Sequence, residues 1–258
     1  MKNRNLRRNN SGQVLIIVSL IITLLILSTA LYVIETEKDT ATYAAKTEYA
    51  LLAYKQGVIH TVISALSNIT NGGDTDILIT DLSQFKSVVT NNSFNAIFKM
   101  EFTLSNTTPY QNGVWINWDS NGRGISSACA NFIFNSSGPS ATYYSEYTVN
   151  VTSEITITGK YTMLNESLKQ ATVACTVFNE NKPALAQNFT VYYEKDGAFP
   201  LEEWMQVAAP NITDYGNGTY VLSFTAETTN PGDPLIISVH CHDLRGIFVR
   251  ANVTCAQV

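Results

Sequence analysis

The longest apolar run of the chain lies near its N-terminus, from residue 14 to residue 34. No charged side chain interrupts it, and Leu, Ile and Val dominate it. As a helix, this run would rise roughly 31 Å, which is enough to cross the hydrocarbon core of a membrane. The pattern predicts a transmembrane helix at residues 13–34.

The charges on either side of this run give it an orientation. Residues 1–12 carry four basic side chains and no acidic one, whereas Glu35 and Glu37 follow the run. Because basic residues favour the cytoplasmic side, we expect a single-pass cell-membrane protein with a cytoplasmic basic tail at 1–12 and an extracytoplasmic C-terminal domain. A cleaved secretory signal is the alternative, since Ser28-Thr29-Ala30 offers small residues, but the apolar run continues beyond them.

The hydrophobic period then changes to that of an amphipathic helix. Residues 35–67 contain no Pro, and apolar side chains recur at helical spacing, for example at Leu51, Val58 and Val62. The run Asn68 to Gly73 is rich in Asn and Gly and should end the helix. We therefore expect an extracytoplasmic stalk helix at 35–67, continuous with the membrane helix or separated from it.

Beyond residue 73 the apolar positions alternate, which is typical of β-strands. Phe94 to Leu104 and Val114 to Trp118 show this alternation most clearly, with Gly- and Asn-rich turns between them. We expect residues 68–146 to form an antiparallel β unit that packs on the stalk helix.

Residues 147–258 repeat the alternating pattern in short segments separated by turns. Seven short strands with such spacing are the pattern of an immunoglobulin-like sandwich. The expected strands cover residues 148–158, 170–179, 188–194, 203–208, 219–226, 235–241 and 247–255. The fold class predicted for the whole chain is α+β, mainly β: a long N-terminal transmembrane-plus-stalk helix, an antiparallel β unit and an immunoglobulin-like β-sandwich.

Two segments carry resemblances to known families. The junction from Arg7 to Leu15 resembles the leader junction of type IV pilins and archaeal pilin-like surface proteins, which implies cleavage between Gly12 and Gln13 and a helix that forms a filament core. The segment Asp214 to Phe224 resembles a strand entry of filamin-type immunoglobulin-like domains. The layout, with its Asp-Leu-Arg-Gly turn at 243–246, is similar to uncharacterised archaeal membrane proteins.

The four cysteines all lie in the part expected outside the cell, where disulfides are stable. If their segments are the second and sixth strands of the sandwich, Cys175 and Cys241 point into one core, at the position of the inter-sheet bridge of immunoglobulin domains. We predict this disulfide, with a Cys129–Cys255 bridge as the less favoured addition. Four buried free thiols are the alternative.

Asn-x-Ser/Thr sequons are dense in the expected ectodomain and suggest a glycoprotein of a eukaryote or archaeon. The ten candidate glycosylation sites are Asn68, Asn91, Asn106, Asn135, Asn150, Asn165, Asn188, Asn211, Asn217 and Asn252.

No pattern in the sequence points to catalysis or to a bound cofactor. His240 and His242 flank Cys241 but lack further metal-ligand spacing, and no nucleophile or phosphate-loop motif is present. Acidic residues outnumber basic ones 21 to 16, which argues against a nucleic-acid partner. We expect a non-enzymatic structural or adhesive surface protein that contacts itself or other envelope proteins. The alternatives are a tethered carbohydrate- or protein-binding module and an accessory subunit of an envelope complex. Exposed aromatics such as Trp115, Trp118 or Trp204 would favour the carbohydrate-binding version.

Overall fold

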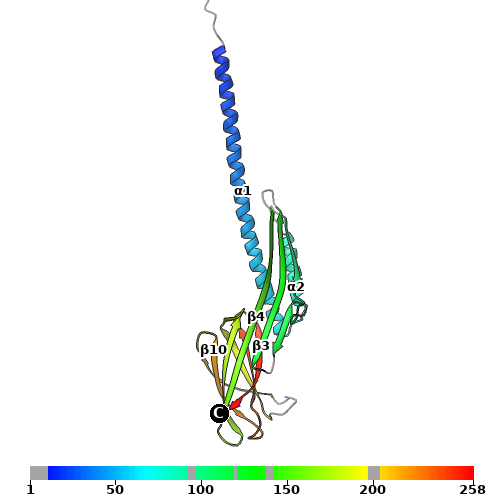
Figure 1. The fold of residues 1–258 in the computed structure, drawn as a ribbon, viewed down its shortest axis with the longest axis vertical. Coiled ribbons are helices and arrows are strands. Elements are labelled where there is room, and N and C mark those ends of the chain that lie inside the picture. The colour runs from blue at the N-terminus through cyan, green and yellow to red at the C-terminus, as the bar shows by residue number, and fades with distance from the viewer. Residues whose placement is uncertain (1–10, 92–96, 119–120, 138–141, 197–203) are drawn as a thin grey trace, which may run out of the picture.

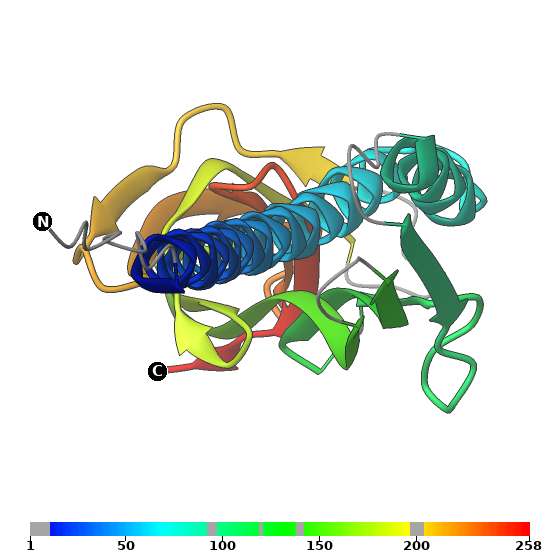
Figure 2. The ribbon, with the colours of Figure 1, turned by 90° about the horizontal axis from the view of Figure 1, so that it is seen from above.

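A computed structural model describes residues 11–91, 97–118, 121–137, 142–196 and 204–258. The protein is mainly β, with antiparallel sheets and a long N-terminal helix, so the mainly β, α+β prediction is confirmed. Figure 1 shows α1 standing away from the β-rich body over much of its length. Viewed from above in Figure 2, the helix runs across the body toward α2.

Helix α1 spans Ser11–Thr70 and joins the predicted membrane segment to the body without a break. Its last turns are anchored in the core, where Val58, Val62, Ala65 and Leu66 are fully buried. These residues recur three or four positions apart and therefore share one helix face. The helix ends at Thr70, and Gly72 follows with a φ of +96°, which suits glycine, while its N–H bonds the Ile69 carbonyl.

The second helix, α2 (Ile77–Asn91), returns alongside α1 and buries Leu78, Leu82 and Val89. The two helices approach closely at Gly57, where an added Cβ would lie 2.5 Å from the Phe85 ring. The small residue at this point therefore lets the helices pack tightly.

The larger sheet has the strand order β1-β3-β4-β5-β10-β9, and all of these neighbours pair antiparallel. Its first three strands are β1 (Ile97–Leu104), β3 (Arg123–Ser137) and β4 (Thr142–Met163), while β2 (Val114–Trp118) also pairs with β3. Phe98, Phe132 and Phe134 from these strands join the buried residues of α1 and α2 in one hydrophobic cluster. The helices therefore cover one face of this part of the sheet.

The β-rich body has two halves, one built around the hydrophobic cluster under α1 and α2 and one built around a second cluster between two sheets. Strand β4 is long enough to belong to both. Its first half pairs with β3 alone, and from Ser153 onward it also pairs with β5 (Leu168–Asn179). The domain boundary expected between residues 146 and 147 thus falls inside a continuous strand.

The second half consists of two sheets around a separate hydrophobic cluster. The larger sheet contributes the end of β4, β5, β10 (Thr219–Glu227) and β9 (Asn211–Asp214). The smaller sheet has the order β12-β11-β7-β8 and consists of Phe248–Thr254, Ile236–Asp243, Ala186–Glu194 and Trp204–Gln206. Val173, Leu222, Val239 and Ala251, from both sheets, are fully buried in the same cluster. Two short strands, β6 (Lys182–Pro183) and β13 (Ala256–Gln257), extend the larger sheet.

Most of the expected strands coincide with observed ones, and the differences are local. The strand expected at 203–208 is reduced to β8 at Trp204–Gln206, and the start of the one expected from residue 94 lies outside the described residues. Strand β9 was not predicted, because all four of its residues are exposed and no buried face produces an alternating pattern.

Candidate functional site

The apolar segment of α1 is the first candidate functional feature. The stretch Ser19–Thr36 has a mean hydropathy of 1.9, is long enough to span a membrane and has no buried residue in the protein itself. The hydroxyls of Thr23, Thr29 and Thr36 donate to carbonyls of the preceding turn, so these polar groups are satisfied within the helix. A lipid environment demands such internal satisfaction of polar groups.

The predicted leader junction lies at the beginning of this helix. Gly12 and Gln13 are the second and third residues of α1. The basic tail at residues 1–10 lies outside the described residues. Cleavage between Gly12 and Gln13 stays a prediction.

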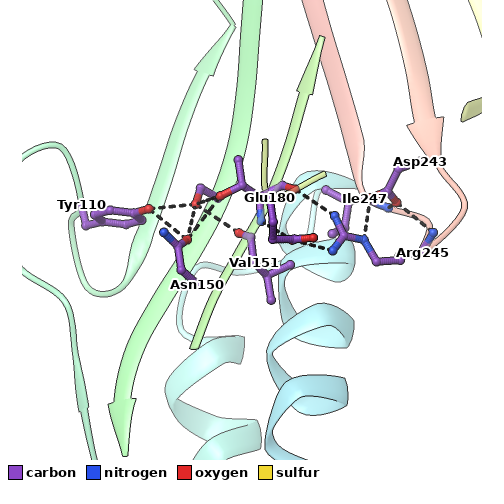
Figure 3. A network of polar contacts seen from close by, with 9 residues as sticks. Tyr110, Asn150, Val151, Glu180, Asp243, Arg245 and Ile247 are labelled. Atoms are coloured by element: carbon purple, nitrogen blue, oxygen red, sulfur yellow. Dashed lines mark hydrogen bonds and ion pairs between the residues drawn. The ribbon is translucent and has the colours of Figure 1, made fainter. Parts of the chain in front are cut away.

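A polar network joins the two halves of the body, and Arg245 is its central residue (Figure 3). The Arg245 Nε donates to the fully buried Asp243 at 2.8 Å, and its two terminal nitrogens reach Glu180 at 2.7 Å and the Thr152 carbonyl at 2.9 Å. Asp243 is held in turn by backbone N–H groups of Arg245 and Ile247, at 2.9 and 3.0 Å. The β11–β12 turn is thereby fixed to β4 at the point where β5 ends.

The network continues on the other side of Thr152. The Thr152 hydroxyl lies 2.7 Å from the Ser127 hydroxyl, and Ser127 also contacts Asn150 and the Tyr110 hydroxyl. The neighbouring Gly246 carbonyl accepts from Ser67 of α1 at 2.9 Å. These contacts tie α1, β3, β4 and the β11–β12 turn together, which is a positioning role rather than a chemical one.

A pocket of about 290 Å³ lies elsewhere, on the face of the smaller sheet that points away from the hydrophobic cluster. We call it the Arg250 pocket; it is lined by Tyr192, Trp204, Ser238, His240, Arg250 and Asn252. The strand register explains the grouping, because Ser238 pairs with both Tyr192 and Asn252, and His240 pairs with Arg250. Three neighbouring strands thus place side chains on one patch.

The polar groups of this pocket are unusual. The Arg250 guanidinium lies 5.0 Å from the centre of the Trp118 ring, and its Nε is buried and has no hydrogen-bond partner among the described residues. The Asn252 Oδ1 is also buried without a partner. His240 bonds Ser238 at 2.9 Å, and burial, followed by the nearby Arg250 charge, lowers the His240 pKa to about 4.

The structure places the two cysteines of the predicted disulfide in the same hydrophobic cluster. Cys175 on β5 and Cys241 on β11 are fully buried and, in this structure, unbridged. Burial raises the pKa of the Cys175 thiol to about 12 and that of Cys241 well above its ordinary value, with Cys175 contributing to the latter. The two thiols are therefore neighbours, and the disulfide stays a prediction. Cys129 and Cys255 are likewise unbridged, and their pairing stays a prediction too.

The sequon asparagines divide into two groups by exposure. Asn135 and Asn252 are half-buried, whereas the other eight are exposed. Among the exposed ones, Asn165 and Asn217 accept backbone N–H bonds in local turns, and Asn188 adopts a positive φ of 55°. The turns at Asn165 and Asn217 are accessible to a glycosylating enzyme, whereas Asn188 lies within β7.

His240 and His242 do not come together with other ligands to form a metal site. Across the described ranges, no group of three or more His, Cys, Asp or Glu side chains is arranged to hold a metal ion. His242 instead bonds Asn71 of the α1 C-terminus at 2.9 Å, so it helps to fix the helix to the smaller sheet.

Comparison with known proteins finds no protein family whose model matches the chain and no curated protein with significant similarity.

Sequence reasoning missed both Arg-centred sites. Arg245 was noted only as part of a turn, and Arg250 was not noted at all, because the contacts of each come from segments far away in the chain. The one available signal was the set of three tryptophans, of which Trp118 and Trp204 do lie around Arg250, whereas Trp115 packs on Tyr110.

Proposed function

We propose that this protein is a single-pass cell-surface protein whose ectodomain is held outside the membrane on a rigid helical stalk, with a structural or adhesive role. The observation that carries the proposal is the continuity of α1. One helix contains the exposed apolar segment at Ser19–Thr36 and, farther along, the buried face at Val58 to Leu66 that anchors the β-rich body.

The strand order supports an immunoglobulin-like assignment of the second half. The order β4-β5-β10-β9 facing β12-β11-β7 corresponds to the A-B-E-D and G-F-C arrangement of constant-type immunoglobulin domains. In this assignment Cys175 and Cys241 occupy strands B and F. Such a module displays loops at its ends and suits adhesion or envelope assembly, although the fold alone does not dictate the ligand.

The pilin-like version of the proposal adds leader cleavage and self-association through the helix. Its support is the Gly12-Gln13 junction together with the absence of any buried residue in Ser19–Thr36, which leaves this part of α1 free to contact lipid or other copies of the helix. The simpler form of the proposal is an uncleaved membrane anchor with the same topology.

The proposal is tested on the full chain in its own cells. Membranes are floated on a density gradient, washed with carbonate, and intact cells are treated with an external protease. We expect the protein to float with the membranes and its body to be accessible from outside. A matched pair of variants sharpens the test: Leu25→Arg lies in the apolar segment and should reduce membrane retention, whereas Leu52→Arg is exposed beyond it and should not. Recovery of the wild-type protein in the soluble fraction would refute the anchor.

A further inference from the structure

Strand β4 has an open edge over its first half. From Ser153 to Met163 this edge pairs with β5, whereas residues 142–151 pair with β3 alone. The open stretch contains no Pro, pairs with β3 without a break in register, and carries Glu146 as its only charge. Natural proteins usually shorten, bend or cover such an edge, because its free backbone groups can accept another strand.

The direction of the backbone groups along this edge follows from the contacts of β3. The Cys129 N–H donates to the Gly113 carbonyl, and the Cys129 carbonyl accepts from the Ser105 N–H. Cys129 thus turns both groups away from Asn150, its partner on β4. In an antiparallel pair of this kind both residues do so, hence the Asn150 N–H and carbonyl point to the open side of β4. The direction repeats at every second residue, which adds Thr148, Glu146 and Tyr144 to this set.

At Thr152, beside the end of β5, two side chains take the place of a neighbouring strand. The Thr152 N–H donates to the Glu180 carboxylate at 2.9 Å, and the Thr152 carbonyl accepts from Arg245 at 2.9 Å (Figure 3). From this point a groove of about 340 Å³ follows the open edge, and Ile59 and Ile63 of α1 form its other wall. The place that β5 occupies beside the second half of β4 is therefore an open groove beside the first half.

The groove selects a partner by its backbone and by one row of side chains. Backbone donors and acceptors that recur roughly every 7 Å along an edge are complementary to an extended polypeptide. Val149 and Val151 lie in the hydrophobic cluster under α1, so residues of an added strand opposite them would face Ile59 and Ile63. Because cross-strand neighbours share a face, those residues should be apolar.

Two charges define the far end of the groove. On the side of α1, the Lys55 ammonium lies 5.0 Å from the centre of the Tyr147 ring, and the ion pairs within the described ranges do not involve it. On the opposite face of β4, Glu146 is exposed. An added strand should therefore place an acidic side chain beside Lys55 and a basic one beside Glu146.

A second copy of the chain does not suit this edge. Near its start, β4 contacts α1 where Tyr147 lies beside Lys55. Farther on, Thr152 bonds Arg245, whose turn bonds Ser67 of α1, so β4 and α1 run in the same direction. A symmetric pair of β4 edges is antiparallel and would point the two membrane helices in opposite directions. This step rests on the membrane anchor proposed above, whereas the groove itself does not.

From these features we propose that the groove beside β4 binds an extended segment of a second, different polypeptide, which joins the sheet as a strand antiparallel to β4 and continues the place of β5. The segment has apolar side chains against Ile59 and Ile63, an acidic one beside Lys55 and a basic one beside Glu146. This inference goes beyond the anchoring and display role, because it assigns the body a binding surface and the kind of partner that fits it.

The test is fluorescence anisotropy of a dye-labelled peptide, Val-Thr-Val-Thr-Asp-Lys-Val-Thr, titrated with the full chain in detergent. With its first Val opposite Val151, the antiparallel peptide places Asp opposite Tyr147 and Lys opposite Glu146. We expect saturable binding, and its absence would overturn the proposal.

Methylated peptides distinguish strand addition from plain hydrophobic contact. N-methylation of the second and fourth residues removes N–H groups that face β4 and should weaken binding at least tenfold. N-methylation of the third and fifth residues removes N–H groups that face away and should leave the affinity unchanged. If the two methylated peptides bind equally, the peptide does not add as a strand and the proposal is wrong.

Variants place the site on the chain. Thr148→Pro removes an N–H of the open edge but none that pairs with β3, so it should fold and weaken binding at least tenfold. Lys55→Glu should weaken binding about threefold, whereas Lys86→Glu, at an exposed position of α2 outside the groove, makes the same charge change and should have no effect. If neither groove variant changes the affinity, the peptide binds elsewhere and the assignment is wrong.

Sedimentation of the chain without peptide tests the choice of partner. We expect the wild type and Thr148→Pro to sediment alike in detergent. If the wild type is a dimer that Thr148→Pro dissociates, a second copy occupies the groove, and the proposal of a different polypeptide is overturned.

Discussion

Removing the Arg245 side chain should destabilise the body far more than removing a surface arginine. Arg245 is 20% exposed, and its Nε is the side-chain partner of Asp243, whose own side chain is 0% exposed. In Arg245→Ala the Asp243 carboxylate keeps two backbone donors but loses its balancing charge inside the protein. Breaking a buried pair in this way costs about 3–5 kcal/mol, and the retained backbone bonds reduce the expected loss to about 2–4 kcal/mol.

The contact with Glu180 contributes little to this estimate. The Glu180 side chain is 45% exposed, so water can solvate its carboxylate once the ion pair with Arg245 is removed. Arg123 provides the matched control, because it makes a comparably short ion pair with Glu154 but is itself 58% exposed. Arg123→Ala should therefore lower the free energy of unfolding by no more than about 1 kcal/mol.

The assay is urea unfolding of the full chain in detergent, followed by tryptophan fluorescence and circular dichroism. Adding Asp243→Asn to Arg245→Ala should restore part of the lost stability, because it removes the carboxylate that the first substitution leaves unbalanced. If Arg245→Ala lowers the free energy of unfolding no more than Arg123→Ala does, or if the double variant is less stable than Arg245→Ala alone, the Arg245 network does not hold the two halves together.

Three further predictions concern other parts of the body. Gly124→Ala should cost at least about 1–3 kcal/mol, because its Cβ would overlap the Arg250 carbonyl oxygen, whereas Gly232→Ala meets nothing within 4 Å and serves as the control in the same unfolding assay. The unfolding free energy should fall by about 1–2 kcal/mol, after allowance for solvent screening, as the pH drops from about 6.5 toward 4, because folding holds the His240 pKa at about 4 against 6.5 in the unfolded chain. If this dependence of the unfolding free energy on pH persists in His240→Gln, the assignment to His240 is wrong. The substitution His60→Gln, at an exposed histidine, is the control and should leave the dependence unchanged. Glycopeptide mapping should find glycans only on exposed sequons such as Asn106 and none on the half-buried Asn135 or Asn252, and an occupied Asn252 would contradict the structure of the pocket.

The parts of the fold that the sequence predicted are those encoded by local periodicity. The helix ending near residue 70 and the strand expected at 219–226, observed as Thr219–Glu227, coincide with the structure, because their apolar positions mark one buried face. The continuity of β4 was not predicted, since its pattern is the same on both sides of the expected boundary and only the identity of its pairing partner changes. Local alternation reports that a strand exists but not which strands lie beside it.

The Arg-centred sites could not be predicted for a related physical reason. Arg245 depends on Thr152 and Glu180, and Arg250 depends on Trp118, so each site exists only after distant strands have paired. The ends of the strands, by contrast, were predictable within a few residues because Gly- and Asn-rich turns mark them. Gly218, for example, has a φ of +82° immediately before β10.

The most direct test of the proposed anchor is the N-terminal residue and intact mass of the protein extracted from its own membranes. The account predicts a mature chain that retains the apolar segment Ser19–Thr36, beginning at Gln13 if the leader is removed as in pilin-like proteins, or at Met1 if the helix is an uncleaved anchor. A chain that begins near Leu31 and is recovered outside the membrane would contradict the account, because the helix would then be a discarded secretion signal and the body a free extracellular domain.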